Sequence, residues 1–417
     1  MPSLTPEQQH EILASGTEEI LPAGGLLERL REAARDQRPL RVKQGFDPTA
    51  PDIHLGHTVG LRKLRQFQEL GHQVILIVGD YTGMVGDPSG RSRTRPQLTE
   101  QEVEAHARTY LEQFFQVLER DPAPPRLPVE VRRNGEWFAP MRFMDVLRLA
   151  SRYTVSQLLE RDDFSKRFEA GQPISVHELL YPLMQGHDSV EIRADVELGA
   201  TEQKFNLIVG RELQRLATQP PQVVMTLPVL PGLDGIQRMS KSLGNYIGVT
   251  DPAVEMFGKV MSLPDAVMPL YWRLVTDAPP AEVAGIEREL ADPNMNPMIV
   301  KKRLGERIAR MYHGAEAAVR ARESFEAQFS RGEVPEDLAE FDHSQVVAAS
   351  AGVERPGVIE LLVAGGIAAS KSAARRLVQQ GAVSLDGEKV SSLEHPVDLG
   401  AEHVLRGGRK MVRYKPA

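Results

Sequence analysis

A strand, helix, strand pattern between residues 40 and 80 constrains the fold of this chain more than any other stretch. QVILIVGD at 73–80 is a short, continuous apolar run that ends in Gly-Asp, which is typical of a strand buried on both faces of a parallel sheet. Leu40 to Gln44 has the pattern of a second strand. Between them lies a helical stripe of apolar residues that ends before Gly71, namely Leu61, Leu64, Phe67 and Leu70. We expect Arg62, Lys63 and Arg65 on the opposite, polar side of that helix, and the whole as a βαβ unit of an α/β protein.

The length of 417 residues exceeds one ordinary core and predicts two or three domains. Residues 98–220 are mostly helical in pattern and are expected as an insertion between two halves of the sheet, with PQVVMTLPVL at 221–230 as a returning strand. The acidic stretch 329–344 is the best linker candidate. We expect three parts: 1–249 with the sheet and its insertion, a helical domain at 250–345, and a small α+β domain at 355–417 with a hairpin at Asp386-Gly387.

Composition narrows the class of protein. Hydrophobic residues make up 41% and charged residues 26%, as in soluble globular proteins, and no run approaches a membrane-spanning length. The N-terminal segment lacks a basic and then apolar leader, so we expect a cytoplasmic protein. Cysteine is absent, which excludes disulfides, thiolate zinc sites and a cysteine nucleophile. The net charge is −7, yet residues 357–417 hold nine Lys and Arg against six Asp and Glu, so contact with a polyanion is expected to be local.

Two short segments predict a nucleotide site. HLGH at 54–57 follows the loop GFDPTAPDI and opens a helix, where backbone N–H groups and imidazoles favour phosphate. QRMSKSLGNYI at 237–247 places Arg238 and Lys241 in a Gly- and Ser-flanked loop, so that two cations can reach a departing pyrophosphate. Alone, the first segment favours structural histidines and the second a solvated turn. Their pairing in this order favours the nucleotide site.

Two further segments carry polar residues with an unusual arrangement. GDYTGMVGDPSGRSRTR at 79–95 follows a strand end, and its glycines permit a tight loop around Asp87 and three arginines. In 177–206, Tyr181, Gln185 and Asp188 fall at i, i+4 and i+7 on one helix face. A solvated face would explain such a set, but so would a pocket for an amino acid that carries a phenol.

Together these segments resemble the class I aminoacyl-tRNA synthetases, and GFDPTAPDIHLGH, 79–95 and the 177–206 segment resemble the tyrosyl-tRNA synthetases in particular. The resemblance implies a Rossmann-like parallel-sheet catalytic domain. It implies an ATP site at Gly45, Asp47, Pro48, Thr49, His54, His57 and Lys241, with catalytic residues His54, Gly56, His57, Arg238, Met239, Ser240, Lys241 and Ser242. It also implies a tyrosine site in which Tyr181 and Gln185 meet the α-amino group, Asp188 accepts the phenol O–H, and Asp87 with Gln203 assists the ammonium.

The C-terminal segment from Arg355 resembles the S-four type of RNA-binding domain. Its second expected helix carries Lys371, Arg375 and Arg376 on one side, with Arg406, Arg409 and Lys410 further on. The resemblance implies an RNA phosphate contact there, while an ordinary solvated helix would explain any one of these residues.

Three positions depart from the tyrosyl-tRNA synthetase pattern. Lys43 stands where many members have a Tyr that contacts the phenol, and Glu202-Gln203 stands where many have Asp-Gln. Arg238 replaces the first Lys of the Lys-Met-Ser-Lys-Ser signature and keeps its charge. These departures leave the roles of Lys43, Glu202 and Arg238 open.

The sequence therefore predicts a tyrosine–tRNA ligase activity in two steps, through tyrosyl-adenylate. The substrates would be tyrosine, ATP and tRNA, and Mg²⁺ is expected to enter with ATP, since no metal-ligand cluster is visible. A homodimer through the insertion follows from the resemblance. Alternatives are a tryptophanyl enzyme, a catalytically silent RNA-binding relative, and a nucleotidyltransferase acting on a small metabolite, which would not need residues 357–417.

Overall fold

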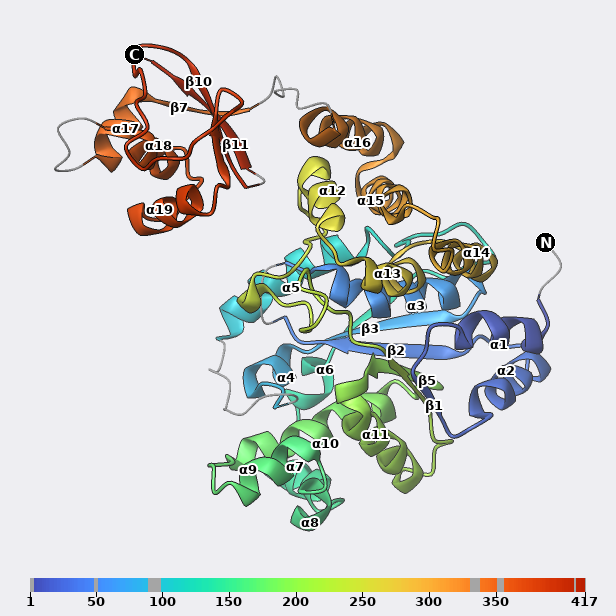
Figure 1. The fold of residues 1–417 in the computed structure, drawn as a ribbon. Coiled ribbons are helices and arrows are strands. Elements are labelled where there is room, and N and C mark those ends of the chain that lie inside the picture. Colours follow the sequence, from blue (N-terminus) through green and yellow to red (C-terminus); the bar gives the residue numbers. More distant parts are fainter. Residues whose placement is uncertain are drawn as a thin grey trace. The chain divides into compact units, whose positions relative to one another are not determined.

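The structure is a computed structural model that describes residues 4–48, 52–88, 99–330, 338–350, 356–408 and 410–416. The chain divides into two compact units, Met1–Arg322 and Glu323–Ala417 (Figure 1). The first unit also contains the helices between Ala253 and His313, so compactness does not separate these from the sheet. The division into 1–249, 250–345 and 355–417 stays a prediction.

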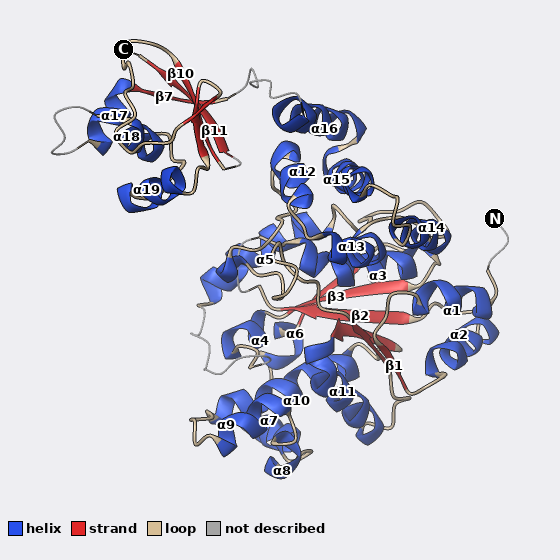
Figure 2. Ribbon diagram, viewed as in Figure 1, coloured by secondary structure: helices blue, strands red, loops and turns tan. Residues whose placement is uncertain are grey.

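The first unit is built on a six-stranded sheet in the order β1-β6-β5-β2-β3-β4, drawn in red in Figure 2. All neighbours are parallel except β1 and β6, which pair antiparallel. The strands are β1 (Glu19–Leu21), β2 (Arg41–Phe46), β3 (Gln73–Val78), β4 (Glu130–Arg133), β5 (Val196–Ala200) and β6 (Val223–Leu227). The predicted strands at 40–44, 73–80 and 221–230 are thus confirmed as β2, β3 and β6.

Helices cover both faces of this sheet, with α3 and α13 on one side and α10 and α11 on the other (Figure 1). The α-helices before the returning strand β6 are α1 (Pro6–Ala14), α2 (Gly25–Arg35), α3 (Leu55–Glu69), α4 (Asp80–Val85), α5 (Glu100–Phe114), α6 (Gly135–Phe138), α7 (Phe143–Ala150), α8 (Val155–Leu158), α9 (Asp162–Glu169), α10 (Val176–Glu191) and α11 (Lys204–Leu216). Those after it are α12 (Ala253–Met261), α13 (Met268–Val275), α14 (Pro280–Leu290), α15 (Pro297–His313) and α16 (Ala315–Ser330). Short 3₁₀ turns are η1 (Thr201–Gln203), η2 (Lys241–Leu243) and η3 (Asp265–Val267).

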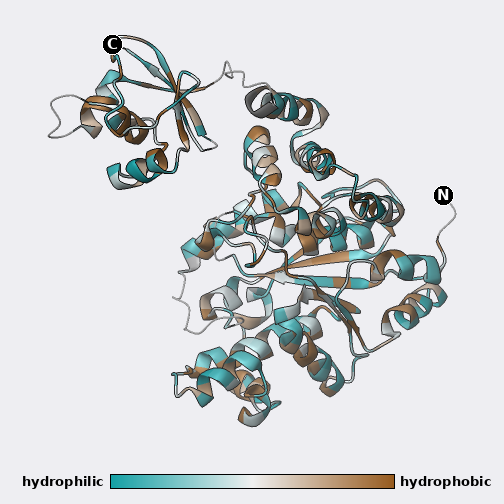
Figure 3. Ribbon diagram, in the orientation of Figure 1, coloured by the Kyte–Doolittle hydropathy of each residue, from teal (hydrophilic) through white to brown (hydrophobic). Residues whose placement is uncertain are grey.

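Strand β3 shows why the sheet is buried on both faces. Val74 and Leu76 pack into the core beneath α3, while Ile75 and Ile77 pack on the other face beside Trp137. All four β3 residues are at most 1% exposed, and β3 appears as a brown, apolar stretch in Figure 3. A strand with two buried faces needs an apolar residue at every buried position, as VILIV at 74–78 provides.

The topology gathers the ends of several strands at one edge. The chain runs from β2 to its neighbour β3 and on to β4, but β5 and β6 lie on the other side of β2. The strand order therefore reverses between β2 and β5, and loops that follow these two strands diverge there. Such a switch point opens a crevice for ligands at the carboxyl ends of parallel strands.

Three expectations need correction. The insertion predicted at 98–220 is too wide, because β4 and β5 inside it are strands of the sheet, and β5 lies next to β2. Within 79–95, residues Asp80–Val85 form the short helix α4, and residues 89–95 lie outside the described part of the chain. Lys63 is not on a solvated face: it is 5% exposed, and its Nζ donates to the carbonyls of Leu13 at 2.9 Å and Ser15 at 2.6 Å. Its long stem carries the charge to carbonyls at the end of α1, which helical periodicity within α3 does not reveal.

The second unit has its own sheet, in the order β7-β11-β10-β8-β9. Its elements are β7 (Ala339–Asp342), α17 (His343–Ala349), α18 (Val358–Ala364), α19 (Lys371–Gln379), β8 (Val383–Leu385), β9 (Glu388–Lys389), β10 (His403–Gly407) and β11 (Lys410–Lys415). Leu361, Leu405 and Tyr414 are fully buried in a separate core. The hairpin at Asp386-Gly387 is confirmed as β8 and β9. The linker predicted at 329–344 is too long, because its end forms β7, paired parallel with β11.

Among the described residues, none of the helices has both the length and the apolar composition required to cross a lipid bilayer.

The imidazole of His403 joins β10 to two loops of the second unit. Burial disfavours the imidazolium, but hydrogen bonds to the Asp386 carboxylate at 2.6 Å and the Asp398 carbonyl at 2.7 Å outweigh it and raise the pKa above 6.5. A group whose pKa is raised by folding contributes its full stabilisation at pH values below its unfolded-state pKa. This contribution is lost as the pH rises through its folded-state pKa. We expect amide hydrogen exchange in β10, corrected for its intrinsic pH dependence, to become faster once the pH exceeds the folded-state pKa of His403. The reference is the corrected exchange rate at pH 5.5.

The variant His403→Gln should remove this pH dependence, and His395→Gln, in a loop of the same unit, should keep it. Equal pH dependence in wild type and His403→Gln would refute the assignment.

Candidate active site

The HLGH segment forms the start of α3 at the carboxyl edge of the sheet. His54 is the N-cap residue, and its Nδ1 accepts from the backbone N–H of Gly56 at 3.2 Å. The Nδ1 of His57 accepts from the backbone N–H of His54, also at 3.2 Å. The two rings stack with centroids 3.9 Å apart. Each imidazole therefore uses its Nδ1 lone pair to satisfy the backbone at the helix N-terminus.

This arrangement determines the state of both imidazoles. Because each Nδ1 accepts a hydrogen bond, the proton of the neutral ring lies on Nε2. Burial lowers the pKa of His54 to about 2, helped by repulsion from His57 and Lys241. Burial and the same lysine lower the pKa of His57 to about 4. At neutral pH both rings are thus uncharged hydrogen-bond donors.

The MSKS segment lies directly beside HLGH, although about 180 residues separate them in the sequence. Leu55 N–H donates to the carbonyl of Ile247 at 2.9 Å, and His54 forms an isolated antiparallel bridge with Gly248. A Cβ at Gly56 would lie 2.9 Å from the His54 ring and 3.5 Å from the Cβ of Met239. Glycine at this position therefore leaves room for the His54 ring, whereas a side chain would meet Met239 only at ordinary van der Waals distance.

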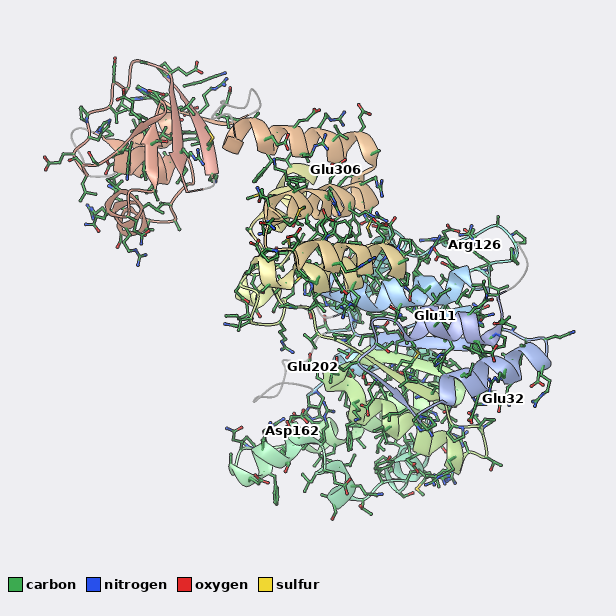
Figure 4. All side chains as sticks on the ribbon, turned by 45° about the vertical axis from the view of Figure 1, so that its right-hand side comes forward. Glu11, Glu32, Arg126, Asp162, Glu202 and Glu306 are labelled. Atoms are coloured by element: carbon green, nitrogen blue, oxygen red, sulfur yellow. The ribbon has the colours of Figure 1, made fainter. Side chains whose placement is uncertain are left out.

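Inside the MSKS segment, each basic residue has an acidic partner. Lys241 Nζ lies 2.9 Å from Asp52 Oδ2 and 5.9 Å from the centroid of the Tyr246 ring. Arg238 Nη1 lies 2.9 Å and 3.0 Å from the two carboxylate oxygens of Glu202, which is labelled in Figure 4. Ser240 and Ser242 share a hydroxyl hydrogen bond of 2.9 Å. The positions 238 and 202, which both depart from the family pattern, are thus partners of each other.

The loop after β2 joins the two predicted ligand sites. Asp47 accepts from the hydroxyl of Thr82 at 2.7 Å and from that of Tyr181 at 2.7 Å. Any Cβ at Gly79 would fall 2.1 Å from Asp47 Oδ1, so only glycine fits there. Gly45 is exposed and Pro48 buried at this edge, and Thr49 lies outside the described residues.

Asp188 on α10 is the deepest carboxylate of the predicted tyrosine site. It is 3% exposed, and its two oxygens accept from Trp137 Nε1 at 3.0 Å and from Asn134 Nδ2 at 3.5 Å. Burial raises its pKa to about 7, against the opposing effect of Lys43. Two neutral donors hold this carboxyl as an acceptor, as a phenol O–H requires.

Three of the other predicted tyrosine-site residues, Asp87, Gln185 and Gln203, belong to one hydrogen-bond network. Gln203 Nε2 donates to Asp87 at 2.7 Å, and Asn206 Nδ2 donates to Gln203 Oε1 at 3.2 Å and to Gln185 Oε1 at 2.8 Å. Arg161 Nη1 donates to Asn206 Oδ1 at 2.9 Å. The structure therefore brings together residues from α10, η1 and the segment after α4.

Lys43 lies beneath this network rather than at the phenol end. Its Nζ is 2.9 Å from Glu197 Oε1, 2.9 Å from the carbonyl of Gln185 and 2.8 Å from the hydroxyl of Ser189. Both members of the ion pair are at most 1% exposed. The departure at position 43 is thus matched by a carboxylate on the neighbouring strand β5.

Sequence reasoning missed several of these residues: Asp52, Thr82, Asn134, Trp137, Arg161, Glu197, Asn206 and Tyr246. One signal was available for Asn134, which follows a strand directly and precedes a glycine, as residues at a carboxyl edge do. Of the others, Asp52, Thr82, Glu197, Asn206 and Tyr246 lie inside the segments already singled out, whereas Trp137 and Arg161 lie outside them and contact the site through long-range packing. Among the described residues, no group of three or more His, Asp or Glu side chains is arranged to hold a metal ion.

The predicted RNA-binding residues lie in the second unit. Arg375 and Arg376 are exposed on α19, and Lys371 is 3.4 Å from the Glu360 carboxylate. Lys410 donates to the carbonyl of Gly366 at 2.8 Å and Arg406 to that of Gly408 at 3.3 Å, while Arg409 lies outside the described residues.

Comparison with known proteins gives concordant results. Residues 35–330 match the family described as tRNA synthetases class I (W and Y), and residues 339–411 match the tyrosine–tRNA ligase SYY-like C-terminal domain. A tyrosine–tRNA ligase of Moorella thermoacetica is 50% identical over 97% of this chain and 94% of its own length. One from Thermotoga maritima is 47% identical over 98% of this chain and 97% of its own length.

The fold is shared with solved structures at lower identity. A C-terminally truncated mitochondrial tyrosyl-tRNA synthetase of Aspergillus nidulans is 20% identical, with a TM-score of 0.65 over 78% of this chain and 94% of its own. A tyrosyl-tRNA synthetase of Archaeoglobus fulgidus, complexed with L-tyrosine, gives a TM-score of 0.59 at 20% identity over 76% of this chain and 99% of its own. From the matched segments and the near full-length relatives, this chain belongs to the tyrosine–tRNA ligases of the class I aminoacyl-tRNA synthetases.

Proposed function

We propose that the carboxyl edge of the sheet is where this tyrosine–tRNA ligase activates tyrosine with ATP and then passes the tyrosyl group to the 3′ end of tRNA. One observation carries the assignment: a buried carboxyl acceptor, Asp188, lies at the carboxyl edge of the sheet, and the neutral donors His54 and His57 with Lys241 belong to the same edge.

In the activation step, a carboxylate oxygen of tyrosine attacks the α-phosphorus, and the bond from that phosphorus to the bridging oxygen of pyrophosphate breaks. Negative charge accumulates on the phosphate oxygens, so donors that need no rearrangement lower the barrier. We assign this role to the Nε2–H groups of His54 and His57 and to the ammonium of Lys241. Arg238 would assist after exchanging Glu202 for phosphate. Gly56, Met239, Ser240 and Ser242 would keep the two segments together, and Gly45, Asp47, Pro48 and Thr49 would border the nucleotide.

For tyrosine, we assign the phenol to Asp188 and the α-ammonium to the acceptors supplied by Asp87, Gln185 and Gln203. Tyr181 holds Asp47 at 2.7 Å and would connect the tyrosine and nucleotide ends. Mg²⁺ would enter with ATP, coordinated by phosphate and water. No residue of this chain is assigned to that ion.

We also propose a cytoplasmic homodimer formed through the inserted helices, which are those between β4 and β5. Large apolar side chains are exposed there, including Phe143 at 75%, Phe168 at 66% and Val176 at 78%. Asp162 in Figure 4 marks α9 within this region. Apolar groups of this size on one group of helices favour a second copy of the chain over water.

Replacement of Asp188 tests the amino-acid assignment. The phenol O–H donates to the ionised carboxylate, so the KM for tyrosine in ATP–pyrophosphate exchange should fall as pH rises through about 7. The variant Asp188→Asn should lose this pH dependence and reduce the preference for tyrosine over phenylalanine by on the order of 10- to 100-fold. Unchanged selectivity would remove Asp188 from the phenol contact, and exchange with tryptophan instead of tyrosine would overturn the substrate assignment.

Replacement of Lys241 tests the phosphate end. The variant Lys241→Met should lower the maximal exchange rate by about 100-fold or more and change the KM for tyrosine by less than about threefold, because the contact is made to charge that develops in the transition state. Lys259→Met is the matched control, since Lys259 also lies over the Tyr246 ring, at 5.0 Å, and is also paired with a carboxylate, Asp251 at 2.7 Å, but lies outside the 237–247 segment. Equal losses in rate and tyrosine affinity would contradict the role of Lys241.

For the second unit we propose a tRNA contact through Lys371, Arg375 and Arg376. The double variant Arg375→Ala/Arg376→Ala should leave pyrophosphate exchange intact and lower kcat/KM for tRNA charging by about tenfold or more, with a shallower salt dependence than wild type. Lys389→Ala, an exposed basic residue on β9, serves as the control. Normal charging by the double variant would show that α19 does not contact tRNA.

A further inference from the structure

Three side-chain amides meet at the amino end of the proposed tyrosine pocket. Asn206 is 1% exposed, and its NH₂ group donates to both Gln185 Oε1 and Gln203 Oε1. The NH₂ of Gln203 continues to Asp87 Oδ2 at 2.7 Å, and that of Gln185 to Glu197 Oε1 at 3.4 Å. An amide turned by 180° exchanges a donor for an acceptor at almost no steric cost, so its orientation depends on its partners.

Charged groups at the ends of the network set all three orientations. Arg161 can only donate, and its Nη1 lies 2.9 Å from Asn206 Oδ1. Asp87 and Glu197 accept at the other ends, and Glu197 is held by Lys43 at 2.9 Å. With a donor at one end and carboxylates at the others, the Asn206 oxygen must face Arg161, and both glutamine oxygens must face Asn206.

The guanidinium of Arg161 is buried and held in place by its neighbours. It is 4% exposed at the N-terminus of α9, with Nε 2.7 Å from Asp163 Oδ1 and its carbon 5.3 Å from the Phe164 ring centroid. Its Nη2 lies 3.4 Å from Asp87 Oδ1. One buried side chain of the inserted helices therefore contacts both Asn206 and Asp87.

We propose that Arg161 and Asn206 are positioning residues for the amino group of the substrate, a role that rests on the proposed tyrosine site. An ammonium has three donors and no acceptor, so the pocket must present oxygens to it. The orientation set by Arg161 through Asn206 keeps Gln185 Oε1 and Gln203 Oε1 on the side of the network where acceptors are needed. Without it, either glutamine can turn and present its NH₂ group to the ammonium.

Charge alone predicts the opposite result, which makes the proposal testable. Arg161→Gln removes a positive charge near Asp87, and Asn206→Asp adds a negative one beside Arg161. Both changes make the pocket more attractive to a cation in purely coulombic terms. Positioning predicts weaker binding instead, because Arg161→Gln removes the donor-only group and Asn206→Asp replaces the NH₂ that both glutamine oxygens accept from.

The experiment measures the KM for tyrosine in ATP–pyrophosphate exchange and the inhibition constants of two competitors in the full chain. Tyramine keeps the amino group and lacks the carboxylate, whereas 3-(4-hydroxyphenyl)propanoate lacks the amino group. We expect both variants to weaken tyrosine and tyramine by about tenfold, the loss of one charge-assisted hydrogen bond, and the propanoate by less than about twofold. Arg161→Lys, which retains a donor-only cation, should restore part of the loss.

Arg167→Gln is the matched control. Arg167 lies on the same helix, is 3% exposed and pairs with the buried Glu178 of α10 at 2.6 Å, so its loss tests packing between α9 and α10 in general. It should leave the ratio of tyramine to propanoate inhibition at the wild-type value. Tighter or unchanged tyrosine binding in Arg161→Gln and Asn206→Asp, equal weakening of both competitors, or the same pattern in Arg167→Gln would each overturn the proposal. Failure of wild-type protein to exchange with tyrosine would instead refute the proposed function.

Discussion

The ammonium of Lys43 and the carboxylate of Glu197 lie 2.9 Å apart with at most 1% of either side chain exposed. Removal of one partner from such a pair leaves an unpaired buried charge, which typically costs about 3–5 kcal/mol. Glu197 also accepts from the Ser189 hydroxyl at 2.9 Å and from Gln222. The pair joins β2 to β5, where the strand order reverses. A buried ion pair therefore lies at the switch point where parallel sheets bind ligands.

The side chains assigned to the substrate contact this ion pair to different degrees. Gln185 contacts Glu197 itself, and Asn206 contacts Gln185. Asp188 takes its donors from Trp137 and Asn134, after β4, rather than from β2. Asp188 with these donors is therefore separate from the network that leads to Asp87. The phenol and amino ends of the proposed site thus have separate hydrogen-bond partners, although both use residues of α10 and the charges of Lys43 and Glu197 also act on the pKa of Asp188.

Sequence reasoning identified the βαβ unit because each of its elements has a local sequence signal: an apolar run, a helical stripe of apolar residues or a terminating glycine. It also singled out His54, Lys241 and Asp188 as site candidates through short motifs, and their roles stay predictions. It missed Arg161 and Asn206 because a hydrogen-bond partner 45 residues away leaves no periodic trace. It placed β5 inside a helical insertion because Val196–Ala200 is only five residues long and is flanked by helical patterns. Lys63 was assigned to water since helical spacing says nothing about carbonyls at the end of another helix.

The bond between Arg238 and Glu202 has a consequence for exchanging parts between relatives. Compared with the Lys and Asp of many family members, each side chain here is longer, and together they span the distance between η1 and the loop after β6 with contacts of 2.9 Å and 3.0 Å. A chimera that imports only a relative's loop at 237–247 would place a shorter Lys opposite Glu202, and its ammonium would not reach as far as the Nη1 of Arg238, which now contacts both Glu202 oxygens. Residues 202 and 238 should therefore be exchanged together, so that a chimera carries both from the same parent.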